Sequence, residues 1–584
     1  MLTLASEARA DVRLPAVIGD NMVLQCGMPA CIWGWAEPGD VITVAFRGQT
    51  RTAQTGADGK WRVELAATAA GGPFELTVIG KNTHTLKNVL VGEVWLGSGQ
   101  SNMAMGMDPK AVMDGAAEIQ AAGYPRLRLF AATGTPSMSP QENVKGHWVA
   151  CSPETVKGFS AVAFFFGREL QQTLDVPVGL IVNAVPGTWA ESWVSREALA
   201  ATPELRHFVD QIDAYPANKV AHDKAVSDFA KQRVDLQNFK LDDTGWEKPG
   251  VDEAGWKTMV QPAEWEKAGL YMDGVLWLRR TVTIPEAWAG QPLELRFGPI
   301  ENEDVIYFNG VPVSASPPER PFPLWPQPRQ CVVPAAQVRS GTAVIAMRVT
   351  NQSGPGGLTG EAGQMLMKPA DAADAEGISL AGPWHYRIAE LRLEPPRAPL
   401  ALDSAWMPTS LFNGLIAPLL PCTIRGVIWY QGEANAWRAE QYRVLFPALI
   451  RDWRARWGMP SSPAGASWPG GDLPFLFVQL PGLRPPAAAP AESDYAELRE
   501  AQMMTLKLPN TGMAVTLDVG EAMNPHPANK RDVGLRLARW AIGVVYGRGG
   551  VYSGPLFRKA TVEGNTVRVT FDQVSSGLVA KAAR

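Results

Sequence analysis

The chain has 584 residues, more than one hydrophobic core organises, and this length predicts roughly three to four domains. Hydrophobic residues make up 46% of the chain and charged residues 19%, which is typical of a folded protein and argues against intrinsic disorder. A net charge of −4 without a long basic run argues against nucleic acid or an anionic membrane as a partner. No apolar run approaches the ~20 residues of a membrane-spanning helix.

The first residues resemble the end of a secretory signal. Residues 8–10 form an Ala-x-Ala pattern, typical of a signal-peptide cleavage site, directly before Asp11. This pattern predicts a periplasmic or secreted protein, although a disordered start would look the same. Of the five cysteines, only Cys26 and Cys31 are close enough in sequence to suggest a local bridge. No cysteine or histidine spacing is typical of a zinc site, and we expect neither a metal nor an organic cofactor.

Regions of short strands and regions with helices alternate along the chain. Residues 11–90 contain short apolar runs between turn clusters and predict a β-sandwich. Strands alternate with helices over residues 91–239 and again over 396–550, which indicates one α/β domain with a parallel sheet covered on both faces. Residues 240–395 return to short strands and predict a β-domain inserted into the α/β domain. Residues 551–584 predict a C-terminal β extension.

Five buried strands are predicted in the α/β domain. They lie near residues 91–96, 178–184, 424–430, 475–480 and 513–517. In open sheets of this kind, the functional site forms beyond the carboxyl ends of the strands. The residues that directly follow these strands are therefore the candidates for a site.

A serine follows the first of these strands. Residues 97–101 run Gly-Ser-Gly-Gln-Ser and place Ser101 on a tight turn, although Ser and Gly are also ordinary turn residues. A nucleophilic serine needs a base, which is usually histidine. Only His526 follows a strand of the α/β sheet, and elimination pairs it with Ser101. The alternative is that both residues are purely structural, with Ser101 in a turn and His526 capping a helix. The five histidines that elimination removes are His84, His147, His207, His222 and His385.

Two further strand ends offer hydrogen-bond donors. Acyl transfer needs donors for the oxyanion that develops on the carbonyl oxygen. Gly187 offers a backbone N–H after the second strand, and Asn435 a side-chain amide after the third. With the N–H of Ser101 they would form an oxyanion hole, although glycine and asparagine are also frequent in plain loops.

Four motifs in order make a family resemblance specific. The chain resembles the sialate O-acetylesterase-type branch of the SGNH hydrolases, over most of its length. The resemblance implies an SGNH-type α/β sheet and a serine esterase, with Ser101 as nucleophile and His526 as base. The motifs are Gly-Gln-Ser-Asn-Met at 99–103, Gly187-Thr188 with Glu191 and Trp193, Trp-Tyr-Gln-Gly-Glu-Ala-Asn at 429–435, and His-Pro-Ala-Asn-Lys at 526–530.

The inserted stretch has a likeness of its own. Residues 252–256, 277–280 and 307–310 resemble the jelly-roll sugar-binding domains that are attached to glycoside hydrolases. The family includes carbohydrate esterases with such an insertion that deacetylate plant polysaccharides such as xyloglucan. The resemblance therefore favours an acetylated plant glycan as substrate, with sialic acid as the alternative.

The chain departs from the family pattern in two places. Many SGNH enzymes have an aspartate three residues before the histidine, or an acid two before it, where this chain has Met523 and Asn524. Asp518, Glu521 or a backbone carbonyl near Asn524 could orient the imidazole instead, and a Ser–His dyad is the remaining option. Relatives continue beyond the strand-like residues 566–571, so we expect the last β-piece to be truncated.

Two other classes of function stay open from the sequence. One is a noncatalytic glycan-binding protein, in which the β-domains bind sugar on an inert scaffold. The other is a glycosidase, which needs two carboxylates at a sugar bond, and Glu191 and Glu433 are the candidates. Either glutamate could equally brace a loop.

Overall fold

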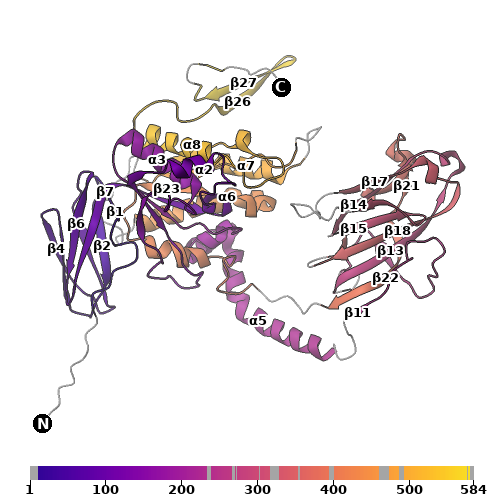
Figure 1. Cartoon of the computed structure of the whole chain (residues 1–584), viewed down its shortest axis with the longest axis horizontal. Helices are drawn as coiled ribbons and strands as arrows, with labels where there is room; N and C mark the ends of the chain where they lie inside the picture. Colours follow the sequence, from indigo (N-terminus) through magenta and orange to yellow (C-terminus); the bar gives the residue numbers. More distant parts are fainter. Residues whose placement is uncertain are drawn as a thin grey trace, which may run out of the picture. The chain divides into compact units, whose positions relative to one another are not determined.

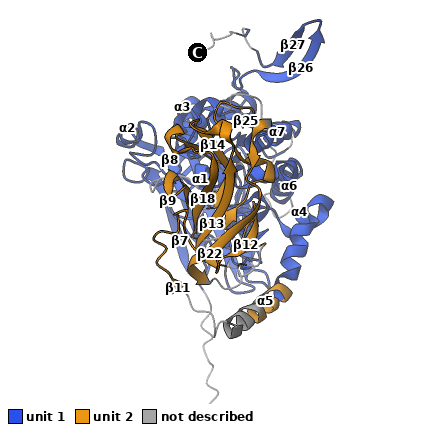
Figure 2. Ribbon diagram, turned by 90° about the vertical axis from the view of Figure 1, so that its right-hand side faces the viewer, with its two compact units in different colours: residues 1–216, 400–584 blue, residues 217–399 orange. Residues whose placement is uncertain are grey.

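The structure is a computed structural model, and it divides the chain into two compact units (Figure 2). Unit 1 comprises residues 1–216 and 400–584, and unit 2 comprises residues 217–399, so that the division falls inside helix α5 (Arg206–Gln232). The described residues are 11–578, except 233–238, 266, 268–269, 271, 302, 316–327, 353–355, 394–399, 459–471, 486–491 and 575–576.

A mixed, mainly parallel sheet forms the centre of unit 1, which confirms the predicted α/β class. All five strands predicted in the α/β domain are present. Together with β8 and β9 they lie in the order β25-β24-β23-β7-β10-β8-β9. Every neighbouring pair in this order is parallel except β8–β9, and these two strands were not predicted. The strands are β7 (Thr83–Gly99), β8 (Tyr124–Ala131), β9 (Trp148–Cys151), β10 (Val178–Val182), β23 (Gly426–Tyr430), β24 (Phe475–Val478) and β25 (Thr511–Ala514).

Helices α3 (Ala161–Leu174) and α8 (Lys530–Trp540) cover one face of this sheet (Figure 1). Their apolar side chains pack in one buried cluster with Trp95 of β7 and Ile428 of β23. Alternate residues of a strand point to opposite faces, so the neighbours of these residues belong to the other face. The shorter helices of unit 1 are α1 (Ser101–Ala104), α2 (Gly115–Gln120) and α4 (Arg196–Ala201).

Helix α6 (Ala439–Trp457) packs on the opposite face and contacts α7 (Asp494–Met504). Val427 and Trp429, which flank Ile428, and Phe475 of β24 lie in a second buried cluster together with the apolar stripe of α6. The two clusters bury both faces of the parallel strands, and this leaves their carboxyl ends as the open edge of the sheet.

Strand β7 also belongs to the β-region at the start of the chain. Its first half pairs with β1 (Val23–Gln25) and β6 (Gly71–Ile79), and its second half enters the parallel sheet between β10 and β23. One continuous strand therefore joins the two parts of unit 1. The remaining strands of the β-region are β2 (Ala30–Trp35), β3 (Val41–Phe46), β4 (Gln49–Gln54) and β5 (Lys60–Leu65).

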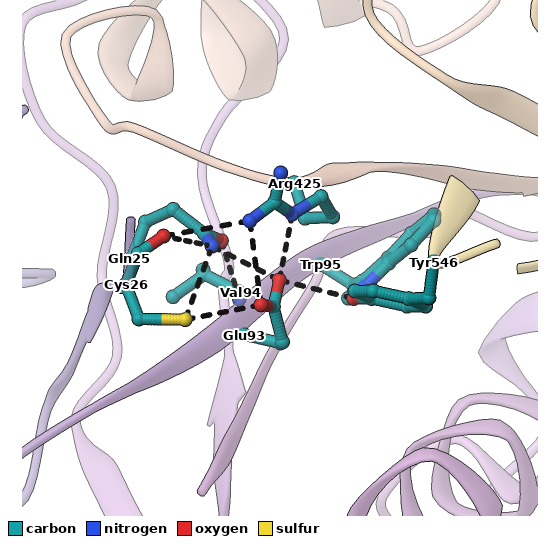
Figure 3. A network of polar contacts seen from close by, with 7 residues as sticks. All are labelled: Gln25, Cys26, Glu93, Val94, Trp95, Arg425 and Tyr546. Atoms are coloured by element: carbon teal, nitrogen blue, oxygen red, sulfur yellow. Dashed lines mark hydrogen bonds and ion pairs between the residues drawn. The ribbon is translucent and has the colours of Figure 1, made fainter. Parts of the chain in front are cut away.

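A buried carboxylate fixes β7 at the point where it enters the parallel sheet (Figure 3). Glu93 accepts hydrogen bonds from Arg425 Nε at 2.7 Å, Gln25 Nε2 at 2.9 Å, Tyr546 Oη at 3.0 Å and Cys26 Sγ at 3.0 Å. Burial alone would raise the pKa of Glu93, but these donors hold it below its usual value. Burial raises the pKa of Cys26 to about 12, so this thiol is a hydrogen-bond donor and not a nucleophile. Cys26 and Cys31 form no bridge.

Unit 2 consists of two antiparallel sheets around its own core. One sheet has the order β11-β22-β13-β18-β15-β16, with β12 beside β22, and the other has the order β17-β14-β20-β21, with β19 beside β14. Its strands are β11 (Phe239–Lys240), β12 (Lys257–Gln261), β13 (Met272–Ile284), β14 (Leu293–Glu301), β15 (Glu303–Phe308), β16 (Val311–Ala315), β17 (Pro328–Val333), β18 (Gly341–Asn351), β19 (Gly357–Leu358), β20 (Met365–Pro369), β21 (Ile378–Ser379) and β22 (Gly382–Leu393).

Residues 556–572 form a two-stranded antiparallel hairpin, β26 (Leu556–Glu563) with β27 (Thr566–Asp572). Most of its side chains are exposed. Within the described ranges, no helix is long and apolar enough to cross a membrane.

Candidate active site

Ser101 lies directly beyond the end of β7, as the first residue of α1. The preceding Gly99 has φ +135°, and a Cβ at this position would lie 2.1 Å from the carbonyl oxygen of Tyr430. Only glycine therefore allows β7 and β23 to approach this closely. Gln100 N donates to Tyr430 O at 2.9 Å, which fixes the serine turn to the end of β23.

The structure brings His526 to this serine from a loop 425 residues away. His526 Nε2 lies 2.8 Å from Ser101 Oγ, within the range of a hydrogen bond. Asn524 braces the loop, because its Oδ1 accepts from His526 N at 2.9 Å and its Nδ2 donates to His526 O at 3.0 Å. Burial, assisted by the nearby Lys530 cation, lowers the pKa of His526 below its ordinary value. The imidazole is therefore neutral near pH 7 and able to accept a proton.

No carboxylate in the described part of the chain hydrogen-bonds to the imidazole of His526. Asp518 instead pairs with Arg536 through both oxygens, at 2.6 and 2.7 Å. Glu521 accepts from Asn524 Nδ2 at 2.9 Å and from Ala528 N at 2.7 Å, so it braces the loop and not the ring. The geometry is that of a Ser–His dyad.

Asn435 lies in the turn after β23 with a fixed orientation of its amide. The residue is 1% exposed, and its Oδ1 accepts from Gln431 Nε2 at 2.6 Å and Ala190 N at 3.0 Å. Its Nδ2 donates to Glu191 Oε2 at 3.0 Å, which leaves one Nδ2 hydrogen without a partner among the described residues. An amide held this way presents a donor without reorganisation, as an oxyanion hole requires.

Gly187 lies in the loop after β10, with φ +70°. This loop is tied to the serine turn by Val185 N, which donates to Gly99 O at 3.0 Å. It is tied to the Asn435 turn by Gln431 Nε2, which donates to Thr188 O at 3.1 Å. The loops of all three predicted oxyanion donors therefore meet at one edge of the sheet.

Each glutamate of the glycosidase alternative is held by a neighbouring side chain, although Oε2 of Glu433 has no hydrogen-bond partner among the described residues. Glu191 is buried and ion-paired, with Arg438 Nη2 at 2.7 Å from its Oε1, in addition to its bond with Asn435. Glu433 Oε1 accepts from Asn102 Nδ2 at 2.5 Å, and burial raises the pKa of Glu433. Both side chains brace loops around the serine. In the part of the chain that the structure describes, no group of three His, Cys, Asp or Glu residues is placed to hold a metal ion.

Four residues of this edge were not predicted from the sequence. Asn102 and Lys530 lie within the quoted motifs, but nothing in the sequence shows that they touch each other. Trp406 and Trp437 are 44% and 69% exposed, which is unusual for tryptophan and could not be read from residue type alone.

Comparison with known proteins agrees with an ester hydrolase. No family model matches the chain. The sialate O-acetylesterase of Mus musculus is 25% identical over 598 residues, which cover 96% of this chain and 79% of the mouse protein. The sialate O-acetylesterase of Homo sapiens is 33% identical over 210 residues, 32% of this chain and 40% of the human protein.

Among solved structures, the chain is similar to a carbohydrate acetylesterase from Xanthomonas citri. The TM-score is 0.58 and the sequence identity 26%, over 96% of this chain and 82% of the Xanthomonas citri protein. In sequence the chain is therefore similar to sialate O-acetylesterases, and in fold it is similar to a carbohydrate acetylesterase.

Proposed function

We propose that the chain is a serine-dependent carbohydrate O-acetylesterase with an SGNH-type catalytic sheet. The observation that carries this proposal is the 2.8 Å contact between Ser101 Oγ and His526 Nε2, at the carboxyl edge of a parallel sheet. The likeness to named acetylesterases supports the acetyl ester as the bond that is cleaved.

The proposed mechanism has two acyl-transfer steps. His526 Nε2 takes the proton of Ser101 Oγ while this oxygen attacks the acetyl carbonyl carbon. The N–H groups of Ser101 and Gly187 and the amide of Asn435 stabilise the oxyanion. The ester bond breaks, and the sugar oxygen leaves with the proton from His526. Water, deprotonated by His526, then attacks the acetyl-serine, acetate leaves, and the proton returns to Ser101.

Two exposed tryptophans support a sugar as the part of the substrate that binds. Trp406 Nε1 donates to Gly187 O at 2.8 Å, so its ring lies beside the proposed oxyanion hole. Trp437 lies two residues after Asn435, and the Arg438 guanidinium stacks 4.6 Å from its ring centroid. Exposed rings that are held in place offer flat apolar surfaces to the C–H face of a sugar.

Among acetylated carbohydrates, the substrate that we propose is a plant polysaccharide or oligosaccharide of the xyloglucan type. A sialic acid ester is the alternative. This choice rests on the motif likeness of unit 2 to jelly-roll sugar-binding domains. We place the enzyme in the periplasm or outside the cell, on the Ala-x-Ala pattern at residues 8–10.

The test measures acetate release from acetylated xyloglucan, xylan, pectin and sialic acid by the wild type and by Ser101→Ala. We expect release by the wild type and none by Ser101→Ala. Ser98→Ala is the matched control, because the buried Ser98 hydroxyl has no hydrogen-bond partner among the described residues, and it should retain wild-type activity. Glycan binding without acetate release by the wild type would instead indicate a noncatalytic glycan-binding protein. Release of reducing sugar from a deacetylated glycan would indicate a glycosidase.

A further inference from the structure

Asn102, the residue after the proposed nucleophile, connects three segments that lie far apart in the sequence. It is fully buried, and its Nδ2 donates to Glu433 Oε1 at 2.5 Å and to Pro525 O at 2.8 Å. Its Oδ1 accepts a hydrogen bond from Lys530 Nζ. Both Nδ2 hydrogens and the oxygen are therefore used, which satisfies the donor capacity of the amide.

Lys530 is a buried cation at the start of α8. The residue is 1% exposed, and its Nζ lies 5.8 Å from the ring centroid of Tyr430. Burial lowers the pKa of Lys530 to about 8, although Glu433 and Glu521 act to raise it. A lysine this deeply buried is costly unless its charge has a task or a partner.

An amide is the side chain that suits the place between Lys530 and Glu433. It accepts from the ammonium group and donates to the carboxylate, so one planar group connects the cation to the anion. An aspartate of the same shape could accept from Lys530 but would present an oxygen to Glu433 and to the Pro525 carbonyl. Asparagine also leaves the second Nδ2 hydrogen for Pro525, the residue directly before His526.

We propose that Asn102, clamped between Lys530 and Glu433, is a positioning residue that holds the His526 loop against Ser101. We also propose that the buried Lys530 ammonium group, which Asn102 links to the residue before His526, repels a proton on the imidazole. This inference rests on the proposed esterase function. It assigns to a buried amide the orienting role that an acid beside the histidine performs in a triad, whereas the cation acts on the imidazolium ion in the opposite sense to such an acid.

The charge relationship has a defined sign. Lys530 from α8 is the charged group that acts on His526, and it lowers the pKa of the imidazole in the same direction as burial does. Glu433, from the turn after β23, and Glu521, from the histidine's own loop, act on Lys530 by raising its pKa. Lys530 disfavours the imidazolium ion, because it is a like charge. Removal of the lysine charge takes this repulsion away, so the pKa of His526 rises and the acid limb of kcat/KM moves to higher pH.

The first experiment uses Asn102→Asp, which keeps the shape of the side chain and loses its donors. We expect kcat for an acetylated sugar to fall on the order of 10²-fold with little change in KM, because a base displaced by about 1 Å loses that much rate. Equal kcat values for wild type and variant would overturn the positioning role.

The second experiment compares pH profiles of kcat/KM for Lys530→Gln and Lys530→Met. Both variants should move the acid limb to higher pH, and only Lys530→Gln should keep a near-normal kcat, because glutamine still offers Asn102 a donor. The position of a pH limb does not depend on the fraction of protein that is folded, so a less stable variant still reports. Arg531→Met is the matched control, since it removes a more exposed cation from the same helix turn, paired with Asp114 and Glu118. It should leave the limb in place.

The outcomes separate this inference from the proposed function. Full activity of Ser101→Ala would reject the esterase mechanism itself. A dead Ser101→Ala together with unshifted acid limbs in both Lys530 variants would keep the mechanism and overturn the role of Lys530. An acid limb that also moves in Arg531→Met would reduce the effect to general surface charge and overturn it as well.

Discussion

His385 of unit 2 and His526 of unit 1 each make a close contact with a polar side chain, and the two contacts differ in kind. In unit 2, His385 Nδ1 pairs with the carboxylate of Glu253, which also accepts from Arg279 Nε at 2.7 Å. In unit 1, His526 has a serine hydroxyl and no carboxylate partner among the described residues. A carboxylate–histidine pair is a common part of a catalytic triad. The pair of Glu253 and His385 instead belongs to a cluster of ion pairs with Arg279 on an antiparallel sheet. In the proposed mechanism, the partner that takes part in the chemistry is the Ser101 hydroxyl at a strand end.

The tryptophans of the two units differ in the same way. In unit 2, Trp256 and Trp277 are buried, and together with Trp246 and Tyr307 they form a packed aromatic cluster. The indole N–H of Trp277 donates to Asp243 at 2.8 Å, whereas the buried indole N–H of Trp256 has no hydrogen-bond partner among the described residues. In unit 1, the rings of Trp406 and Trp437 stay exposed beside the serine edge. The motif that resembles sugar-binding domains therefore supplies core packing, and the exposed rings lie at the site.

The largest expected effect separates the two histidines. His526→Ala removes the proposed base, and we expect kcat for acetate release to fall by about 10³–10⁴-fold. His385→Ala breaks an ion pair on the sheet of unit 2 and should leave kcat within about twofold of wild type, since exposed pairs contribute little. Steady-state kinetics of both variants checks this. Equal losses of kcat in the two variants would mean that His385 also takes part in the reaction, and would contradict the difference between the two histidines.

The second effect concerns the oxyanion donor. Asn435→Ala removes the fixed amide, and we expect kcat to fall by about 10²–10³-fold with a small change in KM. Glu191→Gln keeps an acceptor for Asn435 Nδ2 and should cost less. A KM effect without a kcat effect in Asn435→Ala would assign this amide to substrate binding instead.

The smallest expected effect separates the tryptophans. Trp437→Ala should raise KM for an oligosaccharide roughly fivefold, equivalent to about 1 kcal/mol of ring stacking, and leave kcat for a small aryl acetate unchanged. Trp256→Ala should leave KM unchanged and destabilise the protein by ~3–5 kcal/mol, as expected for a buried aromatic residue. Kinetics and thermal unfolding measure the two variants. An unchanged KM in Trp437→Ala would remove this ring from the sugar site.

Much of the fold of unit 1 could be predicted because its strands are apolar runs buried on both faces. Strands β8 and β9 were missed for a physical reason. The segment that forms β8 contains Pro125, Arg126 and Arg128, which do not fit a buried strand. The structure buries Arg128 by means of hydrogen bonds to Asn21 and Asn88 of the β-region, and these partners are remote in sequence.

The site shows the same limit. Ser101 and His526 could be paired from the sequence because each follows a strand of one sheet, and topology alone brings such ends together. The bond between Asn102 and Lys530 joins residues 428 positions apart and depends on where α8 begins, which no periodicity fixes. Glu191 could be a catalytic carboxylate or a brace until its bonds to Asn435 and Arg438 are known.

The most direct test of the account is to identify the residue that a fluorophosphonate probe modifies. Peptide mass spectrometry of the inactivated wild type should find one adduct, on Ser101, whose extent follows the loss of acetate release. His526→Ala should react far more slowly, because the hydroxyl has lost its base. An inactivated enzyme modified at another residue, or full acetate release from a protein modified at Ser101, would contradict the proposed mechanism.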